Sequence, residues 1–324
     1  MASNTTKTTY KTPSMREDLM EGWYSVEPEE TAALTLIGTA EAATASYKEW
    51  TTGELRAPRK NAQIEGADSI TEGEPVGGAR VGNYTQILAD QATVSTTAEM
   101  IKDAAKLASA KRQVYEKTKE VKRDQEFAIL QNTVAVPGDR TTARELAGFP
   151  AWIRSNADRG AGGADPEMSG GASGSGHPNV APVDGTLRAF TEDLLKSVMV
   201  QRWRASGTRD GALLMGGEAK GKFSGFAGRA EAETRAETKT NWATVDVYVS
   251  DFGKLKAIPS LHQRERDVFI LTADQAGASY LTTPRQRPLA DGALNKKRVI
   301  EAEMTLVVHN ERAHAAIYDI DASL

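Results

Sequence analysis

The amino-acid sequence predicts an α+β fold, in which one unusually long helix lies along a small antiparallel sheet. No glycine or proline interrupts the chain between Tyr84 and Val136, and this permits a long continuous helix. Near the C-terminus, residues 298–309 alternate apolar and polar side chains, which indicates a strand with one buried face. Two extended polar runs, 45–58 and 81–95, flank a segment rich in Gly, Pro and charge. They predict a long hairpin.

Length and composition restrict the class of protein. The chain has 324 residues, a net charge of -4 and no cysteine, and this length suits about two domains. Without cysteine there are no disulfides, thiolate nucleophiles or Cys-ligated zinc sites. The mildly acidic charge does not favour sequence-independent binding to nucleic acid, which needs clustered Lys and Arg. We expect neither a membrane span nor a signal peptide, because no long apolar run is present.

Two short helices are predicted before the hairpin. Ser14 and Glu17 form a capping box at the start of residues 14–21. Residues 28–38 begin with proline and end with glycine, which is the usual asymmetry of helix ends.

The hairpin itself lacks a clean apolar face. Tyr84, Gln86, Leu88 and Asp90 fall on one side of its second strand, and such a mixed side buries little against its own domain. An isolated two-stranded hairpin is marginal in water. We therefore expect the hairpin to rest on a surface outside its own domain.

The long helix is predicted over residues 97–132, with a capping box formed by Thr96 and Glu99. Its 36 residues would span about 54 Å. Apolar residues recur every seven positions from Met100, but the second line of the repeat is polar, as at Lys111. A coiled coil needs both lines to be apolar. A helix lying on a sheet is therefore favoured, and a coiled coil remains the alternative.

The second half of the chain is predicted as a mixture of loop, helix and strands. Residues 160–186 are rich in Gly, Ser and Ala and predict a long surface loop or an insertion. The best strand, 298–309, should pair antiparallel with a last strand that follows the turn at 310–312. The remaining predicted elements are a helix at 187–204 and strands at 243–249 and 267–271.

Motifs for catalysis are weak. The run Gly216–Lys222 has the glycine and lysine spacing of a phosphate-binding loop, but Phe223 stands where the Mg²⁺-binding Ser or Thr belongs. A glycine-rich turn between a strand and a helix is the simpler interpretation. The sequence SDFG at 250–253 lacks the catalytic loop of a kinase and predicts a hairpin turn. The four histidines show no metal spacing, and we predict no catalytic, cofactor-binding or metal-binding residue.

Several segments together resemble the major capsid proteins of tailed bacteriophages, in particular the SU-ten-like branch of the Hong Kong 97-type (Johnson) fold. The resemblance extends in order along nearly the whole chain. Its first part consists of REDL, PEETAALTLIG, YKEW, EGAD, GNYTQI and VKRDQEFAIL. Its second part consists of ELAGFPAWI, VDVYVSDFGKLKAIPS, RDVFILTAD and NERAHAAI.

The resemblance implies a role for each segment of the chain. In such capsids the extended loop called the E-loop lies across a neighbouring subunit, which would supply the surface that the hairpin lacks. The implied divisions are an N-arm at 1–38, an E-loop at 39–95, a P-domain at 96–149 and 283–324 with a spine helix at 96–132, and an A-domain at 150–282 containing the Gly-rich loop 160–186.

The implied function is structural. Copies of the chain would form hexamers and pentamers of an icosahedral head that encloses double-stranded DNA, assembled in the bacterial cytoplasm. Decoration, scaffolding and portal proteins are further implied partners. A nucleotide-binding enzyme and a non-viral, encapsulin-like shell remain alternatives. The residues expected to contact neighbouring subunits are Arg16, Asp18, Trp50, Leu55, Arg56, Arg59, Tyr84 and Gln86.

Overall fold

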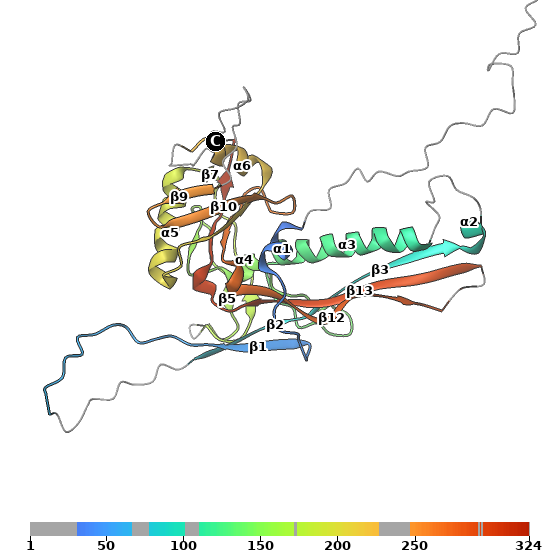
Figure 1. Cartoon of the computed structure of the whole chain (residues 1–324), viewed down its shortest axis with the longest axis horizontal. Coiled ribbons are helices and arrows are strands. Elements are labelled where there is room, and N and C mark those ends of the chain that lie inside the picture. The colour runs from blue at the N-terminus through green and yellow to red at the C-terminus, as the bar shows by residue number, and fades with distance from the viewer. Residues whose placement is uncertain are drawn as a thin grey trace, which may run out of the picture.

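The computed structural model describes residues 31–66, 78–100, 110–171, 174–226, 247–290, 292 and 294–323. The molecule is elongated, with a lobe of helices and strands at one end and a long flat extension at the other (Figure 1). The helices are α1 (Ala32–Ile37), α2 (Thr96–Met100), α3 (Ala110–Gln131), α4 (Phe149–Trp152), α5 (Glu192–Ser206) and α6 (Gly217–Ser224), with the 3₁₀ turns η3 (Ala273–Gln275) and η4 (Glu311–Ala313).

The strands lie in two larger sheets and three small ribbons. A six-stranded sheet has the order β4-β14-β11-β8-β10-β9, and a three-stranded sheet has the order β12-β13-β3. The strands are β1 (Tyr47–Thr52), β2 (Ala79–Tyr84), β3 (Gln86–Ser95), β4 (Ala157–Asp158), β5 (Glu167–Met168), β6 (Pro178–Val180), β7 (Arg188–Ala189), β8 (Gly211–Met215), β9 (Val247–Ser250), β10 (Gly253–Pro259), β11 (Val268–Leu271), β12 (Ala276–Pro288), β13 (Asn295–Val308), β14 (Ala315–Ile317) and β15 (Ile320–Asp321).

The six-stranded sheet forms the core of the lobe. All four residues of β11 are buried, because both faces of the sheet are covered. On one face, Leu213 and Ile270 share a cluster with Leu195 of α5 and Phe223 of α6. On the other face, Phe269 packs near Phe149 of α4, with ring centroids 6.4 Å apart. The strand predicted at 267–271 is confirmed, and its continuous apolar run is the pattern of a strand buried on both faces.

The three-stranded sheet carries helix α3 on one face. Val121 of α3 is buried against Ile300 and Ala302 of β13, and Leu88 of β3 packs against the same cluster. The strand predicted at 298–309 is confirmed as β13. The prediction that the long helix lies on a sheet is also confirmed. Helical residues are described at 96–100 and 110–131, and the residues that would join them, 101–109, lie outside the described part.

The structure corrects the predicted hairpin. Strands β1 and β2 pair antiparallel, with Tyr47 opposite Tyr84. Residues 86–95, however, form β3, which pairs along its length with β13 of the same chain. The change of sheet occurs at Thr85, whose N–H donates to Ser46 O and whose hydroxyl donates to Glu303. The polar strand β3 therefore pairs within its own subunit. The β1–β2 ribbon leads instead to residues 53–66, which form neither helix nor strand.

The predicted pairing of the last two strands is wrong. The turn η4, capped by Asn310, carries the chain out of the three-stranded sheet. Strand β14 then pairs antiparallel with β11 and parallel with β4 in the lobe. Its residues are all buried, because a strand in the middle of a sheet covered on both faces needs no polar side.

One predicted helix begins later than expected, and the start of another is only partly described. Helix α5 begins at Glu192, because the Thr191 hydroxyl accepts a hydrogen bond from the N–H of Leu194, and Leu187 stays exposed before it. Helix α1 is described from Ala32 and ends at Gly38 as predicted. The helix predicted at 14–21, the first part of the helix predicted at 28–38 and the first part of the strand predicted at 243–249 lie outside the described residues.

Helix α1 is held by a buried carboxylate of α3. Glu126 is fully buried and accepts hydrogen bonds from the N–H groups of Ala33 at 2.7 Å and Leu34 at 2.8 Å. These N–H groups have no partner inside the helix. The chain then follows β12, where the N–H of Ala40 donates to Ala278 O. The first described segment is thus fixed to its own subunit.

Candidate assembly surface

The β1–β2 ribbon is anchored to the body of the subunit by Trp50. Its indole N–H donates to Val308 O at 2.9 Å. Its ring packs on Trp152 with centroids 5.3 Å apart. A half-buried tryptophan whose N–H is hydrogen-bonded and whose ring packs on a second ring holds its strand firmly in place. The ribbon therefore leaves the subunit at a defined place.

A cluster of three rings supports the start of the ribbon. The rings of Tyr47 and Tyr84 lie opposite each other across the strands, with centroids 4.6 Å apart and planes tilted by 40°. His177 meets both rings edge-on, at 5.9 Å from Tyr47 and 5.1 Å from Tyr84. Burial lowers the pKa of His177 below its ordinary value, which favours the neutral imidazole at neutral pH.

The Gly-rich stretch 160–186 contributes to this support, which the sequence did not indicate. It contains β5 and β6, which pair antiparallel. Gly176 lies against the ribbon: its N–H donates to Arg80 O, and its carbonyl accepts the N–H of Gly82, both at 2.8 Å. Gly176 has a φ of +84°, a conformation that glycine adopts without strain. Gly176 therefore supports the ribbon through two backbone hydrogen bonds, and we call this contact the brace.

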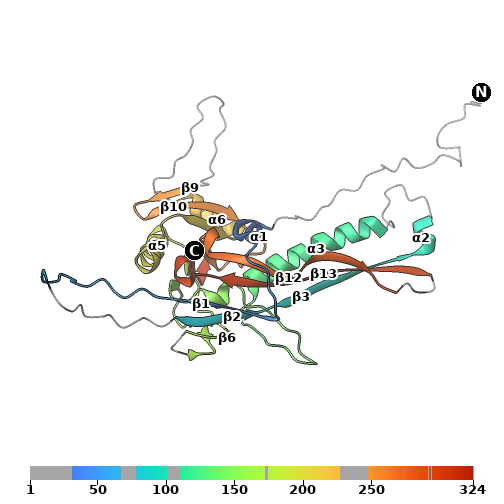
Figure 2. The same cartoon turned by 60° about the horizontal axis from the view of Figure 1, so that its bottom comes forward.

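Beyond the ribbon the chain forms an exposed arm, which we define as residues 53–66. It contains no helix or strand, and every residue in it is exposed. Leu55 is 98% exposed and Ile64 is 85% exposed. Both views show the arm running away from the body of the subunit (Figures 1 and 2). Large apolar side chains in such positions indicate a surface that another molecule covers.

The residues predicted to contact neighbours fall into three groups. Leu55, Arg56 and Arg59 lie on the exposed arm. Trp50, Tyr84 and Gln86 instead contact their own chain, and the Gln86 side-chain oxygen accepts a hydrogen bond from Asn132 at 2.9 Å. The contact prediction for these six residues stays a prediction. Arg16 and Asp18 lie outside the described residues.

Sequence reasoning also missed the buried polar side chains that tie the ribbon to the body. Asn83 is fully buried. Its amide group donates to Ala147 O and Leu306 O, and its oxygen accepts the N–H of Ala147. The polar residues of the GNYTQ run were the sequence feature that could have indicated these hydrogen bonds. In the structure these polar groups satisfy the backbone of adjacent segments.

The phosphate-loop-like turn connects β8 to helix α6, as a strand-to-helix turn should. Its anion site is filled by the chain itself. The Glu265 carboxylate accepts hydrogen bonds from the N–H groups of Gly217 at 3.0 Å and Glu218 at 3.2 Å. A phosphate would meet this negative charge at the helix N-terminus, where it would have to bind. The geometry therefore opposes nucleotide binding at Gly216–Lys222.

The other candidate motifs are structural in the described part of the chain. Residues 250–253 form the turn between β9 and β10, as predicted, and Gly253 has a φ of +132°. The described residues contain no group of three His, Cys, Asp or Glu side chains suited to a metal ion. They also contain no helix long and apolar enough to cross a membrane.

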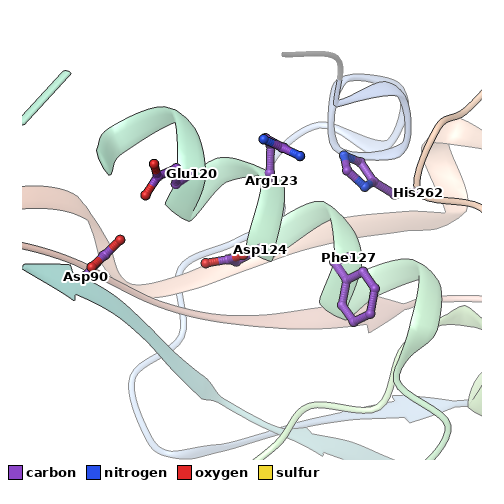
Figure 3. A pocket seen from close by; sticks show the side chains of 6 residues that line it. All are labelled: Asp90, Glu120, Arg123, Asp124, Phe127 and His262. Carbon is purple, nitrogen blue, oxygen red and sulfur yellow. The ribbon is translucent and has the colours of Figure 1, made fainter. Parts of the chain in front are cut away.

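One surface groove lies beside helix α3 and has a volume of about 390 Å³. We call it the spine groove. Four of its residues come from one face of α3, one comes from β3, and one comes from the loop that follows β10 (Figure 3). Its lining residues are Asp90, Glu120, Arg123, Asp124, Phe127 and His262.

Solved structures with the same fold are capsid and compartment shells. The capsid of cyanophage A-1(L) matches with a TM-score of 0.60 and 12% identity, covering 97% of this chain and 98% of that chain. The capsid of a native GTA particle gives the same values. The SrpI encapsulin of Synechococcus elongatus PCC 7942 matches with a TM-score of 0.51 and 12% identity, covering 99% of this chain and 94% of that chain. No curated protein sequence matches.

An extended ribbon and arm, a long helix on a narrow sheet, and a separate lobe define a shell-forming subunit with the Hong Kong 97-type fold. The model of the SU10 major capsid protein family matches residues 2–321. The chain belongs to this family and is a structural protein of the phage head, not an enzyme. It assembles with copies of itself in the virion capsid.

Proposed function

We propose that the chain forms the hexamers and pentamers of an icosahedral head that encloses double-stranded DNA, and that the arm at 53–66 reaches across a neighbouring subunit. The exposed arm carries this proposal. Its ribbon is fixed at Trp50, whereas every residue of the arm is exposed among the described residues. A fixed base and an exposed apolar tip suit a contact between subunits.

The two larger sheets support an assignment of two domains within the subunit. The lobe built on the six-stranded sheet corresponds to the A-domain, and helix α3 with the β12-β13-β3 sheet corresponds to the P-domain. We propose two changes to the boundaries implied by sequence resemblance. Strand β3 joins the P-domain instead of the E-loop, and β14 joins the A-domain.

The charge of the chain bears on how the head is filled. The net charge is -4, so the shell as a whole does not attract DNA electrostatically. Loading by a motor through a portal suits this charge better than condensation of the shell around the genome. Portal, scaffolding and decoration proteins are therefore the partners we propose.

An encapsulin-like compartment is the second candidate, because an encapsulin shares the fold over nearly the whole chain. The two candidates differ in their contents. A phage head holds nuclease-protected DNA, whereas a compartment of the encapsulin kind holds protein. Analysis of particles produced in the native context distinguishes them.

The proposed assembly is tested with the purified full-length chain. We expect light scattering and negative-stain microscopy to show capsomers or closed shells with five-fold and six-fold units. A monodisperse monomer of 34.9 kDa under all assembly conditions would contradict the proposal.

A further inference from the structure

The chain passes between the two larger sheets at two turns that are bonded to each other. Strand β11 of the lobe leads through Thr272 and η3 into β12, and β13 leads through η4 into β14 of the lobe. Both β12 and β13 run from the lobe into the extension (Figure 1). The N–H of His309 donates to Gln275 O at 2.9 Å, which joins the two turns. We call these two turns, residues 272–275 and 309–314, the sheet junction.

His314 joins the two turns of the sheet junction through both nitrogens of its ring. The residue is fully buried. Its Nδ1 accepts the N–H of Thr272, and its Nε2 donates to Gln275 O, each at 3.3 Å. An accepting Nδ1 and a donating Nε2 define the neutral imidazole. A second proton would have to bind Nδ1, where it would face the N–H of Thr272 and abolish that hydrogen bond.

A buried guanidinium binds the same two turns and places a fixed positive charge beside them. Arg202 of α5 is 1% exposed. Its Nε donates to Ala313 O at 2.7 Å, and one Nη donates to the Thr272 hydroxyl at 2.6 Å. The Thr272 hydroxyl in turn donates to Ala313 O at 2.9 Å. Arg202 therefore stabilises the sheet junction, but its charge disfavours a second cation nearby.

Carboxylates on the surrounding elements are bonded elsewhere or exposed. Glu311 of η4 accepts two backbone N–H groups from the loop after α4, at 2.8 Å and 2.6 Å. Asp210, which follows α5, accepts a backbone N–H of β10 at 3.1 Å. Asp274 of η3 is exposed. Among the described residues, none of the three forms an ion pair with His314.

The charged groups that act on His314 are instead basic. The exposed Arg312 of η4 is already ion-paired. The ring of Phe149 lies 5.8 Å from that of His314, between centroids, and covers one side with an apolar surface. Burial first, and then Arg202 and His309, lower the pKa of His314 to about 4, against an ordinary value of 6.5.

We propose that the sheet junction is acid-sensitive: protonation of His314 breaks its hydrogen bond to Thr272 and allows the two turns between the lobe and the extension to open. In the open state water solvates the imidazolium and screens it from Arg202, so the open state binds the proton more tightly. The closed junction is therefore favoured at neutral pH and is weakened as the pH falls from about 6.5 toward about 4. This inference follows from the fold of one subunit and does not depend on shell assembly.

Hydrogen exchange of the full-length chain, measured by mass spectrometry at pH 7 and pH 4.5, tests the inference. The measured rates are divided by the intrinsic exchange rates, which themselves depend on pH. We expect the amides of residues 272–276 and 309–315 to open roughly tenfold or more often at pH 4.5, while the amides of β3 keep their protection. No increase at the junction would overturn the proposal, and so would an equal increase in β3, which would indicate global unfolding.

Two histidine variants identify the titrating group. His314→Gln removes the titration and keeps a side-chain N–H that can donate to Gln275 O. The opening of its junction should exceed that of the wild type at pH 7 and should change little in acid. His309→Gln, at an exposed position of the same turn, should retain the wild-type increase. An increase in His314→Gln equal to that of the wild type would overturn the proposal.

An NMR titration of the wild-type imidazoles covers the case in which His314→Gln does not fold. The chain has four histidines, so the variants His177→Gln, His262→Gln and His309→Gln assign the His314 signal by elimination. We expect the His314 signal to titrate with a midpoint below pH 5.5, because its ring is buried beside Arg202. A midpoint at pH 5.5 or above would overturn the proposal.

Discussion

Asp267 is a buried carboxylate whose charge is only partly compensated. It is fully buried, and neither of its side-chain oxygens accepts a hydrogen bond from the described residues. Arg264 forms an ion pair with it at 3.5 Å but also pairs with Asp184 at 2.6 Å. Burial therefore raises the pKa of Asp267 to about 7. Such residues make stability depend on pH.

We predict that Asp267→Asn flattens the pH dependence of stability. The pKa of Asp267 is about 7 in the folded state, against an ordinary value of 3.8. The folded state therefore binds the proton more tightly, and this contribution to stability is lost as the pH rises through about 7. Melting temperatures of the wild type should fall between pH 5 and pH 8, and those of the variant should fall less.

The exposed carboxylate of Asp251 provides the control for this experiment. Asp251→Asn should keep the wild-type slope of melting temperature against pH. An equal slope in Asp267→Asn and the wild type would show that Asp267 does not titrate in this range.

Glu126 illustrates a second role for a buried carboxylate, because it holds the first turn of α1. We predict that Glu126→Ala loosens the N-terminal segment and destabilises the subunit by about 1–3 kcal/mol, since two N–H groups lose a charged partner. Limited proteolysis should cleave the variant faster before residue 38. Glu116→Ala on the same helix, at a partly exposed ion pair with Arg112, should leave the cleavage rate unchanged.

Helix α3 and strand β13 form the structural element that gives the subunit its length. Val114 and Val121 of the helix face the cluster around Ile300 and Ala302. The strand alternates in burial from Val299 to Met304 and is buried from Met304 to Val308. The helix therefore depends on the sheet beneath it for most of its stability.

A proline at position 114 tests this dependence. Val114→Pro should destabilise the subunit by about 3 kcal/mol or more, because proline removes a helical hydrogen bond and clashes with the preceding turn. Circular dichroism during thermal unfolding measures the effect, with Val114→Ala as the control for lost packing. Equal melting temperatures for the two variants would mean that this part of α3 contributes little to the fold.

Sequence patterns predicted the elements whose burial is regular. Strand β13 alternates, β11 is uniformly apolar, and α3 has no breaker, so each could be recognised from periodicity alone. The pairing of β3 and β14 could not be predicted, because partner choice depends on contacts far apart in the sequence. Thr85, for example, ends the ribbon through a bond to Glu303, and no local pattern reveals that bond.

The candidate site was predictable in part for the same reason. Leu55, Arg56 and Arg59 were expected at a subunit contact from the family resemblance, and the structure places them on the exposed arm. The anchoring roles of Trp50, Tyr84 and Gln86 were not expected, since each depends on a partner distant in the sequence. The brace at Gly176 could not be predicted, because a glycine-rich composition indicates only a loop. The backbone hydrogen bonds of Gly176 depend on the position of the ribbon, which the sequence does not show.

At the scale of the whole molecule, the subunit combines a folded body with a projecting arm. The described residues of the body form three hydrophobic clusters: one on the α5 and α6 face of the six-stranded sheet, one that joins the other face to the end of α3, and a small one beneath α3. The arm projects from the body and adds exposed apolar and cationic groups (Figure 2). A protein built this way gains its full burial only in an assembly, which is consistent with its family.

The most direct test of this account removes the arm and keeps the ribbon. Residues 55–77 are replaced by a short Gly-Ser turn, which leaves β1, β2 and the contacts of Gly176 in place. We predict an unchanged circular dichroism spectrum, a melting temperature close to that of the wild type, and no closed shells by negative-stain microscopy. Normal shells from the armless subunit would contradict the claim that the arm joins neighbouring subunits.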